Sequence, residues 1–194
     1  MRDSSYVRWT IMRTTPTTQT AAPETAFSTI LDFDLQGTVA GYWLAVLRVV
    51  TGYWFLHAGF TKFSFVAGEP FDAAGYLLHG TTASPIHGFF AWVAGTPWLI
   101  EFTNFAIPAG EFLIGLGLVV GALVRLASFF GAFLMVFFYL GNADWAHGLV
   151  NGDLMGLLLF VTIATLGAGR ILGLDVFVER LDLAQTRIAK FLLG

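Results

Sequence analysis

The sequence predicts an all-α integral membrane protein built as a four-helix bundle. Of its 194 residues, 56% are hydrophobic and only 12% are charged, which is about half the charged fraction of a soluble domain. Four apolar stretches have about the 20 residues that a helix needs to cross a bilayer. Because no Pro- or Ser-rich linker divides them, we expect one bundle rather than two domains.

The four predicted spans cover residues 39–63, 98–124, 126–145 and 150–172. Aromatic residues, which anchor helices at the membrane surface, lie near their ends: Tyr42, Trp43, Trp98, Tyr139 and Trp145. We therefore divide the chain into a polar cytoplasmic tail (1–38), a transmembrane domain (39–172) and a cytoplasmic amphipathic helix (173–194).

Positive charges mark one side of the predicted bundle. They precede the first span, occupy the short second connection and follow the fourth span: Arg2, Arg8, Arg13, Arg125, Arg170, Arg180, Arg187 and Lys190. After Lys62, the first and third connections contain no Lys or Arg. Because Lys and Arg concentrate in cytoplasmic loops, both termini of this multi-pass protein are predicted to face the cytoplasm, with the cell membrane as its location.

The segments outside the spans also carry predictions. The N-terminal tail lacks the apolar core of a signal peptide, so we expect it to stay attached and to be partly disordered. Apolar residues recur at helical spacing after Gly173, as in a helix that lies on the membrane. Packing against a partner subunit would produce the same pattern.

The first outer connection, residues 64–97, is too long and too apolar for a simple turn. Its residues typical of helix starts and stops are Glu69-Pro70, Ser84-Pro85, Gly80 and Gly95. They predict two short interfacial helices, which would form either a lid over an outward-facing pocket or a connector on the membrane surface.

Composition excludes several classes of function. The chain has no cysteine, which removes disulfides, thiolate metal sites, iron-sulfur clusters and thiol relays. The net charge is −3 and the basic residues form no dense run, so no nucleic-acid partner is expected. No metal site is predicted, and any redox activity would require a borrowed cofactor such as a quinone.

Ionisable residues within or beside the apolar spans are the candidate site residues, because a charge inside a bilayer is unfavourable unless it is paired or hydrated. The candidates for a catalytic role are Arg48, His57, Lys62, Glu101, Glu111 and Asp153. The first two spans run antiparallel, which predicts that Lys62 pairs with Glu101 near the outer surface and Arg48 with Glu111 deeper in the bundle. These pairs would either lock the helices together or serve a reaction.

A polar vestibule is predicted at the outer mouth. Its expected members come from all four spans and their ends: His57, Lys62, Glu101, Asn104, Asn142, Asp144, His147, Asn151 and Asp153. His57 has the chemistry of a proton carrier or a haem ligand, although no second histidine lies at a spacing that would complete a haem site. Pro108 is expected to kink the second span close to Glu111.

Three segments resemble the DoxX family of membrane proteins. Residues 47–63, LRVVTGYWFLHAGFTKF, resemble the family's first helix through Arg48, Gly52, Gly59 and Lys62. Residues 111–128, EFLIGLGLVVGALVRLAS, resemble its second helix and inner turn through Glu111 and Arg125, and residues 167–175, GAGRILGLD, resemble its closing signature. The resemblance assigns no catalytic residues.

The tail and the long outer connection look more like DoxD, the large subunit of thiosulfate:quinone oxidoreductase. That resemblance implies oxidation of thiosulfate to tetrathionate, with electrons passed to a membrane quinone. The first functional hypothesis is therefore a quinone-linked oxidoreductase subunit that acts on thiosulfate or a related small sulfur anion. The second is a non-enzymatic accessory subunit or small transporter, working as a homo-oligomer or with a second membrane subunit.

Overall fold

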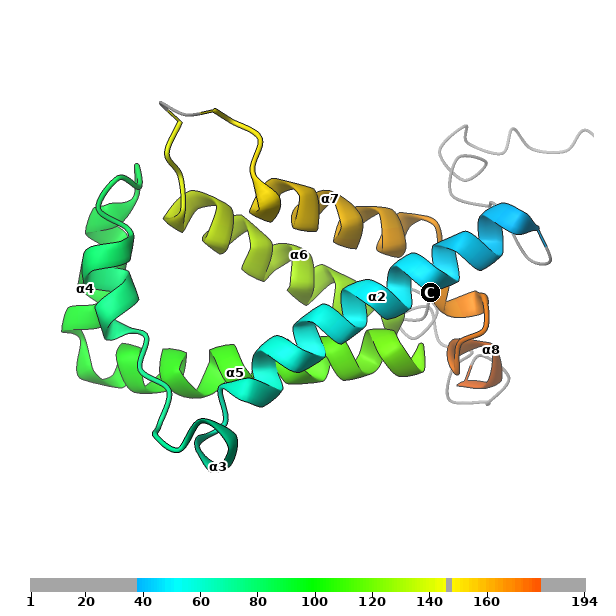
Figure 1. Ribbon diagram of the computed structural model, residues 1–194, viewed down its shortest axis with the longest axis horizontal. Coiled ribbons are helices and arrows are strands. Elements are labelled where there is room, and N and C mark those ends of the chain that lie inside the picture. The colour runs from blue at the N-terminus through cyan, green and yellow to red at the C-terminus, as the bar shows by residue number, and fades with distance from the viewer. Residues whose placement is uncertain (1–37, 146–147, 179–194) are drawn as a thin grey trace, which may run out of the picture. The chain divides into compact units, whose positions relative to one another are not determined.

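The computed structural model describes residues 38–145 and 148–178, and every regular element in these two stretches is helical (Figure 1). Both stretches belong to one compact unit, Phe33–Gly194. Four main helices are α2 (Val39–Thr61), α5 (Pro97–Val120), α6 (Val124–Gly141) and α7 (Gly152–Thr165). The short elements are α3 (Ser64–Ala67), the π-helix η1 (Tyr76–Gly80), α4 (His87–Gly95), the 3-10 helix η2 (Ala168–Arg170) and α8 (Asp175–Val178). The all-α prediction is confirmed.

Within the described residues, three helices are long and apolar enough to cross a membrane: α2, α5 and α6. Their outward surfaces carry large apolar side chains, such as Phe105, Leu113 and Phe129, an arrangement that suits lipid and not water. The fourth predicted span is shorter than expected, because α7 has 14 residues and ends at Thr165. Gly167 then adopts a left-handed conformation with φ +62°, which turns the chain out of the helix.

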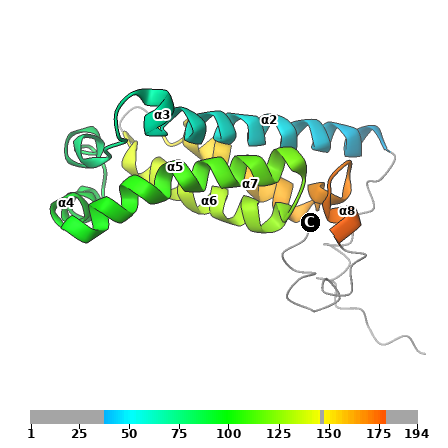
Figure 2. The same ribbon diagram turned by 90° about the horizontal axis from the view of Figure 1, so that it is seen from below.

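The four helices form two closely packed pairs, α2 with α5 and α6 with α7, while α5 and α6 contact each other less (Figures 1 and 2). Glycines allow the close approach within each pair. A Cβ at Gly59 would lie 2.3 Å from the Phe112 backbone N, and one at Gly115 would lie 2.1 Å from the Leu56 N. Gly131 accommodates the Phe160 ring in the other pair.

The main core lies where α5 turns into α6. Leu118, Val124, Phe160, Ile163 and Ala168 are all completely buried there. From this closed end α5 and α6 diverge toward α4, so the bundle is wider at the α4 end (Figure 1). A smaller apolar cluster, Ala73, Leu77, Phe90 and Val93, lies within the first outer connection and packs against α5 and α6 through Leu99, Ile100 and Phe137.

The first outer connection forms three short helices instead of two. The predicted stops at Gly80 and Gly95 coincide with the ends of η1 and α4, but the predicted starts at Glu69 and Ser84 are wrong. Ser84 donates a hydrogen bond to the Leu140 carbonyl (2.6 Å) and thereby fixes the connection to α6 before α4 begins. The predicted tail (1–38, apart from its last residue) and most of the C-terminal amphipathic helix lie outside the described residues.

Candidate functional site

The buried charges of the bundle fall into two groups at different levels. The Arg48–Asp175 cluster lies at the closed end, where α2, the α5–α6 turn and the segment after α7 meet. The Lys62–Glu111 pair joins the C-terminal end of α2 to the middle of α5. About 21 Å of helical rise separates Arg48 from Lys62 along α2.

The backbone of residues 167–175, the closing signature, surrounds the Arg48 side chain. Its guanidinium donates hydrogen bonds to the Ala168 carbonyl (3.2 Å) and the Leu172 carbonyl (3.1 Å), and the side chain is only 1% exposed. A Cβ at Gly121 or Gly173 would collide with Arg48 Nη1. Arg48 therefore binds the C-terminal part of the chain to the first helix.

Asp175 completes this cluster, and the sequence did not identify it as a site residue. Its carboxylate accepts hydrogen bonds from the backbone N–H groups of Leu123 (2.7 Å) and Val124 (3.1 Å), and it interacts electrostatically with Arg48. An acidic group at these unsatisfied N–H groups caps the first turn of α6. The signal in the sequence was the Leu-Asp that ends the closing signature, which the amphipathic pattern of 173–194 obscured.

The Lys62–Glu111 pair is less enclosed. Lys62 Nζ lies 2.5 Å from Glu111 Oε2, donates to the Ala58 carbonyl (3.3 Å) and stands 6.0 Å from the centre of the Phe71 ring. Glu111 is 5% exposed, whereas the Lys62 side chain is 28% exposed. The close contact of Gly59 with α5 brings the two side chains within reach.

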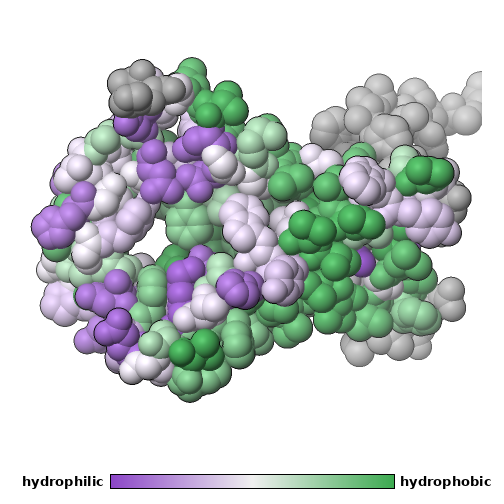
Figure 3. All heavy atoms as spheres, in the orientation of Figure 1, coloured by the Kyte–Doolittle hydropathy of each residue, from purple (hydrophilic) through white to green (hydrophobic). Residues whose placement is uncertain are grey.

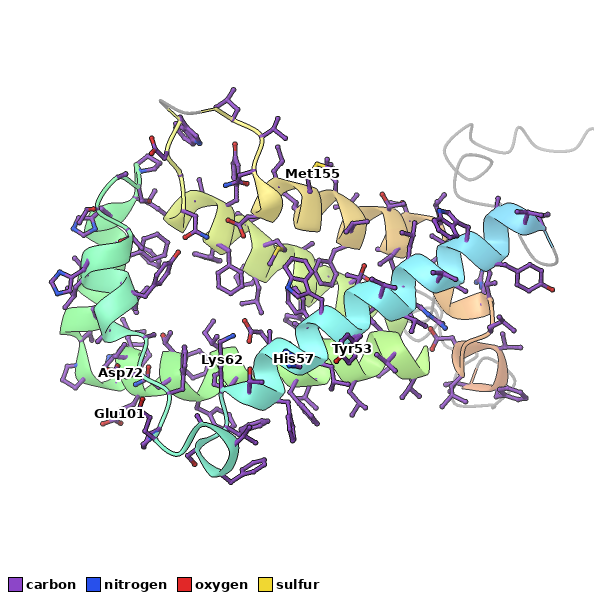
Figure 4. The ribbon with its side chains drawn as sticks, in the orientation of Figure 1. Tyr53, His57, Lys62, Asp72, Glu101 and Met155 are labelled. Carbon is purple, nitrogen blue, oxygen red and sulfur yellow. The ribbon has the colours of Figure 1, made fainter. Side chains whose placement is uncertain are left out.

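Both predicted ion pairs are wrong. Arg48 interacts with Asp175 and backbone carbonyls instead of Glu111, and Lys62 pairs with Glu111 instead of Glu101. The prediction placed the ends of α2 and α5 at one level. In fact Glu101 lies about 15 Å from Glu111 by helical rise, because α5 runs on to Pro97, well beyond the level at which α2 ends. Glu101 is exposed and projects away from Lys62 (Figure 4).

His57 and Asp153 occupy different surroundings. His57 is exposed on α2, where its ring lies 6.0 Å from that of Tyr53. Asp153, at the start of α7, accepts a hydrogen bond from Asn142 Nδ2 (2.8 Å), and Asn142 Oδ1 accepts one from the Tyr76 hydroxyl (2.6 Å). Three elements thus meet in one chain of hydrogen bonds, of which the sequence identified Asn142 and Asp153 but not Tyr76.

The other predicted vestibule residues are divided. Asn104 accepts from the Ala73 backbone N (2.8 Å) and contacts Asp72, whereas Asn151 caps α7 and Asp144 is exposed. His147 lies outside the described residues. Figure 3 shows hydrophilic side chains gathered around a hollow at the α4 end, while the opposite end is mostly hydrophobic.

The electrostatics of this end favour a protonated Tyr76. Burial, with a contribution from the Asp153 carboxylate, raises the pKa of Tyr76. The hydroxyl therefore remains a hydrogen-bond donor to Asn142 at neutral pH. Among the described residues no group of three or more His, Asp or Glu side chains is placed to hold a metal ion.

Comparison with known proteins gives one match. No curated protein and no solved structure matches the chain. A family model, DoxX, matches residues 43–142, a region that runs from α2 to the end of α6 and includes Arg48, Lys62 and Glu111. Since the match covers just over half of the chain, this membrane protein belongs to the DoxX family.

Proposed function

We propose that this DoxX protein is the membrane subunit of a quinone-linked oxidoreductase and that the Lys62–Glu111 pair binds the quinone head group. The observation that carries the proposal is the state of Lys62. Its ammonium has three N–H groups, and contacts within the described residues use two of them, to Glu111 and Ala58. The third N–H, on a side chain that is 28% exposed, is available to a quinone oxygen.

The surroundings of the pair suit a quinone ring. Phe63 and Phe112, the chain neighbours of Lys62 and Glu111, contact each other edge to face with centroids 5.6 Å apart. Phe60 also lies beside Phe112 and is 44% exposed on the surface of the bundle. A ring that enters from the lipid would therefore meet aromatic side chains next to a cation and a carboxylate.

The reaction proposed for the complex follows the resemblance to DoxD. Two thiosulfate anions form one sulfur–sulfur bond and lose two electrons, giving tetrathionate. One quinone takes these two electrons together with two protons and becomes the quinol. A bound quinone supplies the electron acceptor, and this chain supplies the N–H donor of Lys62 and the carboxylate of Glu111, which return to their starting protonation after two protons have passed.

The proposed topology has four crossings with both termini in the cytoplasm. The segment 166–172 would extend α7, which covers about 21 Å by helical rise, toward the far membrane surface. The Arg residues at the closed end, Arg125 and Arg170, would then face the cytoplasm. The α4 end would face outward, where a sulfur anion and a second subunit could reach it.

A different role is favoured by one observation. Lys62 and Glu111 neutralise each other without any ligand, as expected if the pair only fastens α2 to α5. The chain would then be a non-enzymatic accessory subunit or a small transporter that works as an oligomer.

Thiosulfate-dependent quinone reduction separates these functions. The purified chain is assayed with a short-chain quinone, alone and with membrane extract that supplies a partner subunit. We expect Lys62→Met and Glu111→Gln to lower turnover about a hundredfold, as for loss of a proton-transferring group, while the exposed Glu101→Gln leaves it unchanged. Absence of turnover in both preparations of the wild type would exclude the oxidoreductase role.

A further inference from the structure

The Lys62–Glu111 pair has very different surroundings on its two sides along the bundle axis. Toward the closed end, Phe55 contacts Phe160 edge to face with centroids 4.7 Å apart, and both are almost fully buried. Gly52 and Gly115 bring the α2 and α5 backbones into direct contact at the same level. Buried aromatic rings and closely packed backbones therefore separate the pair from Arg48.

Toward α4 the surroundings include many polar side chains. α2 ends at Thr61, close to the pair. α5 reaches further toward α4, because about four of its turns, from Pro97 onward, precede Glu111. Beside the small apolar cluster of Ala73, Leu77, Phe90 and Val93, this end carries hydrogen-bonded polar side chains from the outer connection, α5, the end of α6 and α7: Asp72, Tyr76, Asn104, Asn142 and Asp153. The hollow in Figure 3 lies among hydrophilic residues, and Figure 4 shows Lys62 directed into the space between α5 and α6.

We infer that water reaches the Lys62–Glu111 pair from the α4 end and not from the Arg48 end, so that the pair exchanges protons with one side of the membrane. This inference deepens the proposed function, and its functional consequence rests on that proposal: each quinone that is reduced would take its two protons from the α4 side. The charged groups of the described residues on that side are Glu69, Asp72, Asp144 and Asp153, whereas Glu101 projects away.

The absence of cysteine makes the chain a ready background for testing water access. Single cysteines are introduced by Lys62→Cys combined with Glu111→Gln, and by Leu134→Cys, a half-buried position of α6 whose side chain faces Gly110. Glu69→Cys, exposed in the outer connection, reports which side carries α4. Thr51→Cys, buried near the closed end, is the matched control.

Each variant is treated with a membrane-impermeant thiol reagent from either side of sealed vesicles. We expect positions 62 and 134 to react from the same side as position 69, at least about tenfold faster than from the other side, because the reactive thiolate requires water. Position 51 should react from neither side. Labelling of position 134 from the opposite side, from both sides equally or from neither side overturns the inference, and it does so even if the variant at position 62 fails to fold.

The result is independent of the quinone assay. One-sided labelling together with a wild type that reduces no quinone would retain the water path and reject the proposed oxidoreductase. Quinone reduction together with labelling from the Arg48 side would support the oxidoreductase and overturn the inferred water path.

Discussion

The Arg48–Asp175 cluster and the Lys62–Glu111 pair both place a cation and an anion inside an apolar bundle, but they differ in how completely the protein surrounds them. Arg48 and Asp175 are buried and bind backbone groups of two separate segments, 168–172 and 123–124. Lys62 keeps part of its surface exposed and has hydrogen-bonding capacity left over. The two sets of charges therefore differ in role: Arg48 and Asp175 hold segments of the chain together at the closed end, and Lys62 and Glu111 form a candidate ligand site nearer the α4 end.

The largest loss of stability should come from a change in the Arg48–Asp175 cluster. Asp175→Ala leaves two backbone N–H groups without their acceptor and the buried Arg48 without its carboxylate. We expect the free energy of unfolding in detergent micelles to fall by about 3–5 kcal/mol, as when one partner of a buried ion pair is removed. Thermal melting followed by circular dichroism measures this loss.

Asp175→Asn is the control for this comparison, because it keeps an oxygen acceptor for the α6 N–H groups and removes only the charge. It should lose less stability than Asp175→Ala. Equal losses would mean that the α6 cap contributes nothing and that only the charge matters.

The next largest effect concerns the backbone contact that makes the Lys62–Glu111 pair possible. Gly59→Ala would bring a Cβ within 2.3 Å of the Phe112 N and 2.7 Å of the Pro108 O, and backbone atoms cannot move aside singly. Forcing α2 and α5 apart should destabilise the protein by about 3 kcal/mol. Gly110→Ala, whose Cβ would meet nothing closer than 4.0 Å, should be nearly neutral in the same melting experiment.

A smaller and asymmetric effect is expected at the pair itself. Lys62→Met leaves the carboxylate of Glu111 buried without its partner and should cost about 2 kcal/mol. Glu111→Gln leaves a lysine that can reach solvent and should cost less. The double variant should recover part of the loss, so additive effects in the double-mutant cycle would show that the two residues act separately.

The sequence predicted the helices better than their mutual register. Hydropathy placed α2, α5 and α6 to within a few residues, because a stretch of about 20 apolar residues is typical of a membrane-spanning helix. Hydropathy wrongly extended the fourth span to residue 172, because Leu and Ile residues flank Gly167 and Gly169. In the structure the chain turns at Gly167 and encloses Arg48.

The candidate site was predicted by residue type but not by partner. Lys62 and Glu111 were identified because charges are rare in spans. Their pairing depends on where Gly59 and Gly115 let the two backbones meet, which hydropathy does not encode. Tyr76 was missed because an aromatic residue in an apolar connection indicates lipid contact as readily as a hydrogen bond to Asn142.

The smallest expected effect tests the polar end through its response to pH. The pKa of Tyr76 is raised in the folded protein, so the folded state holds the phenolic proton more tightly than the unfolded chain does. The resulting stabilisation is complete below the unfolded pKa of about 10 and is lost as the pH rises through the higher folded value. Tyr76→Phe should lower stability at neutral pH by about 1 kcal/mol, through loss of the hydrogen bond to Asn142.

The same substitution should also flatten the alkaline loss of stability, measured as melting temperature against pH. Tyr139→Phe is the matched control, because it removes a hydroxyl that donates to the Leu149 carbonyl and leaves Tyr76 in place. That control should keep the alkaline slope. If Tyr76→Phe keeps it as well, neither burial nor the Asp153 carboxylate raises the pKa of Tyr76 in the folded protein.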